Sequence, residues 1–398
     1  MTNRTKRITY TRSIILEIVL YGFVLFIMGV FYLLFFRKYL AHSWDGNYHI
    51  MFAEMFLNQS IESMQEVDIN IPVQSMTYPL FHLTVKALAS VIRGNYYAAA
   101  YVVLAGTVVL AALLFRILFQ GIYQPKRTAE RMMLDLLSIF AVVFLTARGP
   151  LTDWRFYARQ CGANPVHNPT LLYSRPFGIL SFLFFVRFLE KYDKKEKYIV
   201  DIVLYAVTNL LCIFSKPSFA FVFMIAEGFV ILAKMIQKKD LRVGCIALVS
   251  VIPSIAVLFW QFNAITGAST IATFGIQFGS FSNFRPMEVL AVSLATFPVP
   301  LLLFSSKIFS KDHYYQLAYL ALAVGWIEMF FLTNGPSGDF SWGYDLAVQF
   351  STVIALVCAL KYRFARWRIF VSGGIFLYQV ICGIQYIIQV FLHYEILI

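Results

Sequence analysis

Long runs of apolar residues, separated by short clusters of basic residues, dominate the chain. The first run covers about residues 13–36, and similar runs recur as far as residue 392. Several are long enough to cross the hydrocarbon core, because a helix needs about 20 apolar residues for that. A transmembrane barrel requires strands in which apolar and polar residues alternate, and runs such as 23–36 show no such alternation. The pattern therefore predicts an all-α, polytopic transmembrane bundle.

We predict eleven spans and one shorter helix in a single membrane domain, residues 1–398. The predicted spans are about 13–36, 95–119, 132–146, 177–189, 198–214, 218–235, 243–262, 287–304, 314–332, 345–361 and 369–392. The shorter helix, about 78–92, is too short to cross and carries His82 and Lys86. These properties favour an interfacial or re-entrant helix within the first outer loop, about 37–94.

Composition supports the membrane assignment. The chain is 60% hydrophobic with a mean hydropathy of +0.70, and only 14% of its residues are charged, against about 25% in soluble domains. The first span is typical of a signal anchor rather than a cleavable signal peptide. Four of the five cysteines fall in the spans, which argues against a disulfide framework.

The net charge of +12 would suit a nucleic-acid partner, but membrane orientation explains it better. Cytoplasmic loops of membrane proteins concentrate Lys and Arg. With the N-terminus inside, 23 of the 33 basic residues lie on the predicted inner side. We therefore expect a multi-pass cell-membrane protein with a cytoplasmic N-terminus, a membrane-lipid partner, no nucleic-acid partner and an active site on the outer face.

The first candidate for chemistry is Asp45, in the first outer loop. A helix starting near Ser43 would place His42, Asp45, His49 and Phe52 on one face. The Asp45 carboxylate could act as a general base with His49 adjusting its proton affinity, or as part of the shell of a divalent cation, Mg or Mn. The alternative is that Asp45 caps the following helix.

The second candidate is a basic outer loop, about 147–176, rich in turn-forming residues. Guanidinium groups bind phosphate through paired hydrogen bonds, so this loop favours a phosphate or pyrophosphate clamp. The alternative is that its cations extend to lipid headgroups. The candidate binding residues here are Arg155, Arg159, His167, Asn168 and Arg175.

Three further residues extend the candidate site. Lys216 precedes Pro217 at a tight outer turn and could neutralise a phosphate, although Pro217 could simply start a helix. Glu328 lies within a span and should face the bundle interior, as a second acid or as an ion-pair partner of Arg285 or Lys216. Asp339 lies in an aromatic outer turn, where aromatic residues form an interfacial belt or stack on sugars.

Two segments of the first quarter of the chain carry a family resemblance: Trp44-Asp45-Gly46-Asn47-Tyr48-His49 and Thr77-Tyr78-Pro79-Leu80-Phe81-His82. With an N-terminus inside and a long first outer loop, they resemble the GT-C superfamily of integral-membrane glycosyltransferases. The resemblance implies sugar transfer from a polyprenyl-phosphate-linked donor to a glycan, lipid or protein acceptor. It implies that Asp45 alone is the catalytic base or a metal ligand. Tyr78 and His82 are further candidate substrate-binding residues. Asn47 stands where paired acids of the superfamily would have their second member.

Two other functions stay open. A polymerase of polyprenyl-pyrophosphate-linked repeat units, in surface-polysaccharide assembly, would depend on the arginines and histidines of the outer loops. A transporter or flippase would show paired charges or broken helices near the midplane.

Overall fold

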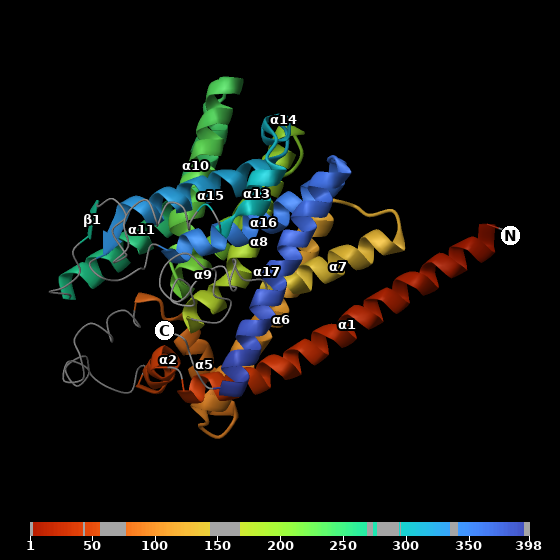
Figure 1. The fold of residues 1–398 in the computed structure, drawn as a ribbon. Coiled ribbons are helices and arrows are strands. Elements are labelled where there is room, and N and C mark those ends of the chain that lie inside the picture. Colours follow the sequence, from red (N-terminus) through yellow and green to blue (C-terminus); the bar gives the residue numbers. More distant parts are fainter. Residues whose placement is uncertain are drawn as a thin grey trace.

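The structure is a computed structural model that describes residues 3–42, 44–55, 77–143, 168–268, 274–276, 294, 296–334 and 341–393. Within these ranges almost all elements are helices that pack side by side (Figure 1). Seven of the described helices are long and apolar enough to cross a membrane. The prediction of an all-α, multi-pass bundle is confirmed at this level, whereas the number of eleven spans is not.

The seven long apolar helices are α1 (Asn3–His42), α6 (Tyr96–Ile122), α8 (Pro169–Asp193), α10 (Ser218–Lys238), α11 (Leu241–Ala268), α16 (Ser341–Lys361) and α17 (Arg366–His393). The other described helices are α2 (Trp44–Met55), α5 (Leu80–Val91), α7 (Thr128–Val143), α9 (Ile199–Ser215), α13 (Pro298–Leu303), α14 (Ser306–Phe309) and α15 (His313–Phe331).

The predicted start of helix α8 is wrong. Helix α8 begins at Pro169, two turns earlier than predicted, because the Asn168 side chain caps it and Pro169 suits the first helical turn. Pro176 therefore lies inside α8 rather than at its start. Of the predicted span 287–304, the described residues 294, 296 and 298–303 are helical, and a non-helical Phe297 precedes helix α13 (Pro298–Leu303).

A short pair of strands was not predicted. Strand β1 (Phe274–Ile276) pairs in antiparallel register with β2 (Leu332–Asn334), so that Gly275 lies opposite Thr333. β2 follows α15 directly, because Leu332 leaves the helical conformation for an extended one. The pairing ties the segment after α11 to the end of α15.

Helix α16 forms the centre of the bundle and α11 lies at its edge. Nearly all of the apolar stretch of α16 is buried, whereas most of that of α11 is exposed. Around α16 the rings of Phe182, Phe223 and Phe350 form a cluster, with centroids 5.1 Å apart for Phe223–Phe350 and 5.3 Å for Phe182–Phe350. Such pairs add about 0.5–1.5 kcal/mol each beyond the area they bury, so the cluster joins α8 and α10 to α16.

Acidic side chains join the helix ends on one side of the bundle. Asp193, at the end of α8, pairs with Lys238 at the end of α10 (2.5 Å) and with His313 at the start of α15 (2.9 Å). Asp312 caps α15 and pairs with Lys361 at the end of α16 (2.6 Å). We call this side, with residues 193–201, 234–242, 311–313 and 361–368, the basic end.

Helices α1, α6 and α7 are joined by a buried ionic network. The carboxylate of Glu17 accepts from Arg131 at 2.7 Å and from Arg116 at 3.5 Å. Arg116 also donates to Asp135 at 2.5 Å. The pairs fix α1 against the helices that follow it, while its first turns extend beyond the rest of the bundle (Figure 1).

Helices α2 and α5 lie at the opposite side, where α1 ends (Figure 1). Helix α5 buries Phe81, His82, Val85 and Ala89 on one face and exposes Leu83. The spacing of the buried residues is that of an amphipathic helix. A short α5 after Tyr78 and Pro79 was predicted, and the helix is confirmed.

Candidate functional site at the histidine end

A buried pair of histidines joins α2 to α5. Nδ1 of His49 lies 3.0 Å from Nε2 of His82, and the two rings are stacked with centroids 5.2 Å apart. His49 is 7% exposed and His82 is completely buried. Phe52 and Phe81 cover the pair edge-on. In such a hydrogen bond one ring nitrogen donates and the other accepts, so both rings are held in defined tautomers.

The environment keeps His49 neutral. Burial, together with the positive charge of Lys216, lowers the pKa of His49 from 6.5 to about 3. A neutral imidazole at pH 7 can donate one hydrogen bond and accept another, but it cannot supply a charge. His49 is therefore suited to orienting a neighbouring group.

Lys216 occupies the turn between α9 and α10, as predicted. It is the C-terminal cap of α9, and Pro217 caps the start of α10. Its ammonium nitrogen lies 5.2 Å from the centre of the Tyr78 ring, in the range of a cation–π contact. The amide of Gln261 on α11 donates to Thr77 O (2.6 Å) and Ile213 O (3.2 Å), which fixes the segment before α5 against the last turn of α9.

Arg175 lies inside the bundle, and its predicted place in an outer loop is wrong. It is in the second turn of α8 and only 4% of its surface is exposed. Its neighbour Tyr173 contacts α5 through a 2.8 Å hydrogen bond to Thr84. Ser174 O lies 3.7 Å from Sγ of Cys212, one turn before Lys216. These contacts bring the turn of α8 that carries Arg175 next to α5 and to the end of α9.

Two buried residues near Arg175 were not predicted as site residues. The guanidinium of Arg175 interacts electrostatically with the carboxyl of Asp345 on α16 and with the hydroxyl of Tyr32 on α1. Asp345 Oδ1 and the Tyr32 hydroxyl have no hydrogen-bond partner among the described residues. Asp345 could have been found from the sequence, because it is an ionisable residue within the first turn of an apolar span.

Helix α16 brings Asp345 to the same side as Lys216. A Cβ atom added at Gly343 would lie 2.8 Å from Ser218 O, so the first turn of α16 contacts the first turn of α10. We call this side the histidine end and define it by His49, His82, Arg175, Lys216 and Asp345.

Asp45 lies one turn before His49 on the same helix. Helix α2 begins at Trp44, so Asp45 falls within its first turn. Residues four apart share a helix face, so Asp45 is on the face of α2 that carries His49. The side chains of His42 and Asp45 lie outside the described part.

The remaining predicted residues divide into three groups. Asn168 is a helix cap whose side chain accepts from Leu171 N at 2.9 Å. Glu328 is buried in the last turn of α15, and within the described part it forms no ion pair with Lys216. Four predicted residues lie outside the described residues: Arg155, Arg159, His167 and Asp339.

The described residues do not supply a ligand set for Mg or Mn. No group of three or more His, Cys, Asp or Glu side chains within them is close enough to hold a metal ion. His49 and His82 each use one ring nitrogen in the hydrogen bond between them. The histidine end instead gathers two cations, a hydrogen-bonded histidine pair and a carboxyl group, which together suit an anion bound beside a polar hydroxyl-bearing molecule.

Comparisons of the chain with protein-family models, curated proteins and solved structures found no match. Function therefore has to be inferred from the residues and their geometry.

Proposed function

We propose that the protein is a membrane glycosyltransferase that takes a sugar from a polyprenyl-phosphate-linked donor at the histidine end. One observation carries the proposal: Lys216 contacts Tyr78, and the turn of α8 that carries Arg175 packs against α5 and the end of α9, so both cations lie close to the segments that resemble GT-C glycosyltransferases. Cations in partly dry surroundings bind phosphate more strongly than cations in water.

The phosphate of the donor would be held by Arg175 and Lys216. The planar guanidinium of Arg175 can bind two phosphate oxygens, and the ammonium of Lys216 adds a point charge. The phosphate is also the leaving group, so the same cations stabilise the charge that develops on it during transfer.

Asp45 would remove the proton from the hydroxyl of the acceptor. It is on the face of α2 that carries His49, whose ring is fixed by His82. A carboxylate within hydrogen-bond reach of a hydroxyl can act as a general base. The neutral His49 would orient the donor or acceptor without competing for the proton.

Orientation follows from the charge of the two ends. The positive-inside bias favours the basic end in the cytoplasm and the histidine end on the outer face of the cell membrane. Nucleotide-linked sugars are made in the cytoplasm, so an outer-face enzyme would depend on a lipid-linked donor.

Binding of a polyprenyl monophosphate to the purified protein tests this proposal. Loss of a charge-assisted hydrogen bond costs about 1.5–3 kcal/mol, so Arg175→Gln and Lys216→Gln should each bind it at least about tenfold more weakly. Arg37→Gln is the matched control, because Arg37 is an exposed cation near the end of α1. Native mass spectrometry gives the affinity, and thermal unfolding shows whether each variant is folded. Wild-type affinity in both folded variants would overturn the proposal.

A transporter or flippase is the second candidate. It is favoured by the interruption before Pro298 in an otherwise apolar segment and by the buried charges of Arg175 and Asp345. Transport of a lipid-linked sugar across proteoliposomes, with the sugar still attached to its lipid, would identify it. The polymerase hypothesis predicts that Arg175 is essential while Asp45→Asn is tolerated.

A further inference from the structure

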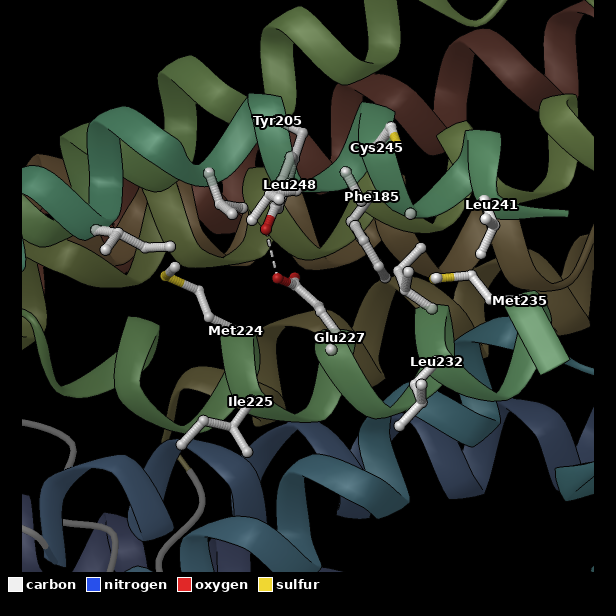
Figure 2. A pocket seen from close by; sticks show the side chains of 16 residues that line it. Phe185, Tyr205, Met224, Ile225, Glu227, Leu232, Met235, Leu241, Cys245 and Leu248 are labelled. Atoms are coloured by element: carbon white, nitrogen blue, oxygen red, sulfur yellow. Dashed lines mark hydrogen bonds between the residues drawn. The ribbon is translucent and has the colours of Figure 1, made fainter.

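A second feature with chemical potential lies away from the histidine end, between α9, α10 and α11. Here the structure has a cavity of about 590 Å³ (Figure 2), within the range of about 300–1,000 Å³ that is usual for small-molecule sites. Its walls are aliphatic, aromatic and sulfur-containing side chains, among them Phe185, Met224 and Met235. Glu227 and Tyr205 provide the carboxyl and hydroxyl groups of the wall.

Glu227 is not satisfied by its surroundings. It is 4% exposed, and its Oε2 accepts a 2.5 Å hydrogen bond from the Tyr205 hydroxyl across the cavity (Figure 2). Its Oε1 is buried and has no hydrogen-bond partner among the described residues, and no described cation forms an ion pair with it. An unpaired buried polar atom is costly, which points to a partner supplied from outside the chain.

The cavity opens toward the hydrocarbon of the membrane. Four of its lining residues are at the same time exposed on the surfaces of the spans α10 and α11: Ile225, Leu232, Leu241 and Leu248. A molecule that reaches the cavity past these side chains has to be dissolved in the bilayer.

The depth of Glu227 restricts the polar group of such a molecule. Glu227 is near the middle of α10 (Ser218–Lys238), about 15 Å from either end at 1.5 Å per residue. Charged headgroups are too costly at that depth. A carboxyl without a nearby cation is accommodated there in its neutral form, which both donates and accepts hydrogen bonds. A hydroxyl group is complementary to it.

Because Gly228 has no side chain, it leaves open space in the wall of the cavity. A Cβ atom added there would meet nothing within 4 Å. Gly in the middle of a helix costs about 0.5–1 kcal/mol relative to Ala, so its presence next to Glu227 is not explained by helix stability.

We propose that this cavity binds a hydroxyl-bearing neutral membrane lipid, whose chain packs along Met224 and Met235 and whose hydroxyl group hydrogen-bonds to Oε1 of Glu227. The inference is independent of the function proposed for the histidine end.

Photolabelling of the full chain in detergent micelles tests it with two probes: a long-chain primary alcohol that carries a diazirine, and the matched alkane. Gly228→Leu fills the cavity and should reduce labelling of α10 and α11 by the alcohol at least tenfold. Glu227→Leu removes the hydrogen bond, worth about 0.5–1.5 kcal/mol, and should weaken the alcohol about two- to tenfold while leaving the alkane unchanged.

Gly106→Leu is the control, because Gly106 is exposed on α6 and also has nothing within 4 Å of an added Cβ. It should leave labelling at the wild-type level. Thermal unfolding confirms that the variants are folded. Undiminished labelling of folded Gly228→Leu, or equal affinity of wild type for alcohol and alkane, would overturn the proposal.

Discussion

The stability of the protein should fall as the pH falls, because the side chain of His49 is buried in its neutral form. Its folded-state pKa of about 3 is below the ordinary value of 6.5, chiefly because the ring is buried. Between these values the unfolded chain binds a proton that the folded protein does not, so acid favours unfolding. The unfolded histidine is protonated only below about pH 6.5. Between there and pH 5, about 1.5 pH units at 1.36 kcal/mol per unit lower the free energy of unfolding by about 2 kcal/mol.

The assay is the free energy of unfolding in mixed micelles at pH 8 and pH 5, for the wild type and for His49→Gln. Titrating groups that do not contact His49 are common to both proteins and cancel in the comparison. We expect His49→Gln to be less stable than wild type at pH 8, because the hydrogen bond to His82 is altered. The decrease in the free energy of unfolding of His49→Gln between pH 8 and pH 5 should be about 2 kcal/mol smaller than that of the wild type. Equal losses in the two proteins would refute the assignment of a neutral, buried His49.

Three other substitutions have defined outcomes in thermal unfolding. Glu17→Gln should cost about 3–5 kcal/mol, because it leaves the buried Arg131 without its carboxylate; an unchanged midpoint would contradict the ionic network. Gly343→Ala should cost about 1–3 kcal/mol, because its Cβ would lie 2.8 Å from Ser218 O. Gly228→Ala should be neutral or stabilising by up to about 1 kcal/mol, and a loss of stability there would mean that the cavity is not open.

The fold was predictable where local signals are strong. Basic clusters after successive apolar runs indicated which helix ends lie together, and the pairs of Asp193 with Lys238 and His313 agree with that order. Proline was the main source of error. Pro176 favoured a loop, but in apolar helices neighbouring groups compensate for its missing N–H, so Arg175 lies in α8 instead.

The site was predictable only as a set of separate residues. His49 and His82 were both candidates, yet their contact joins positions 33 residues apart and depends on how α2 packs on α5. Asp345 and Glu227 were not among the predicted site residues, although each is an ionisable residue within an apolar span. Their burial and missing partners appear only once the helices are packed.

The most direct measurement of the proposed activity is conversion of a lipid-linked donor. The purified protein is incubated with a total polyprenyl-phosphate-sugar extract and acceptor membranes, and release of free polyprenyl phosphate is followed by mass spectrometry. We predict release by the wild type and loss of release in Asp45→Asn at an unchanged unfolding temperature. Release by folded Asp45→Asn at the wild-type rate, or no release by the wild type, would contradict a glycosyltransferase that uses Asp45 as its base.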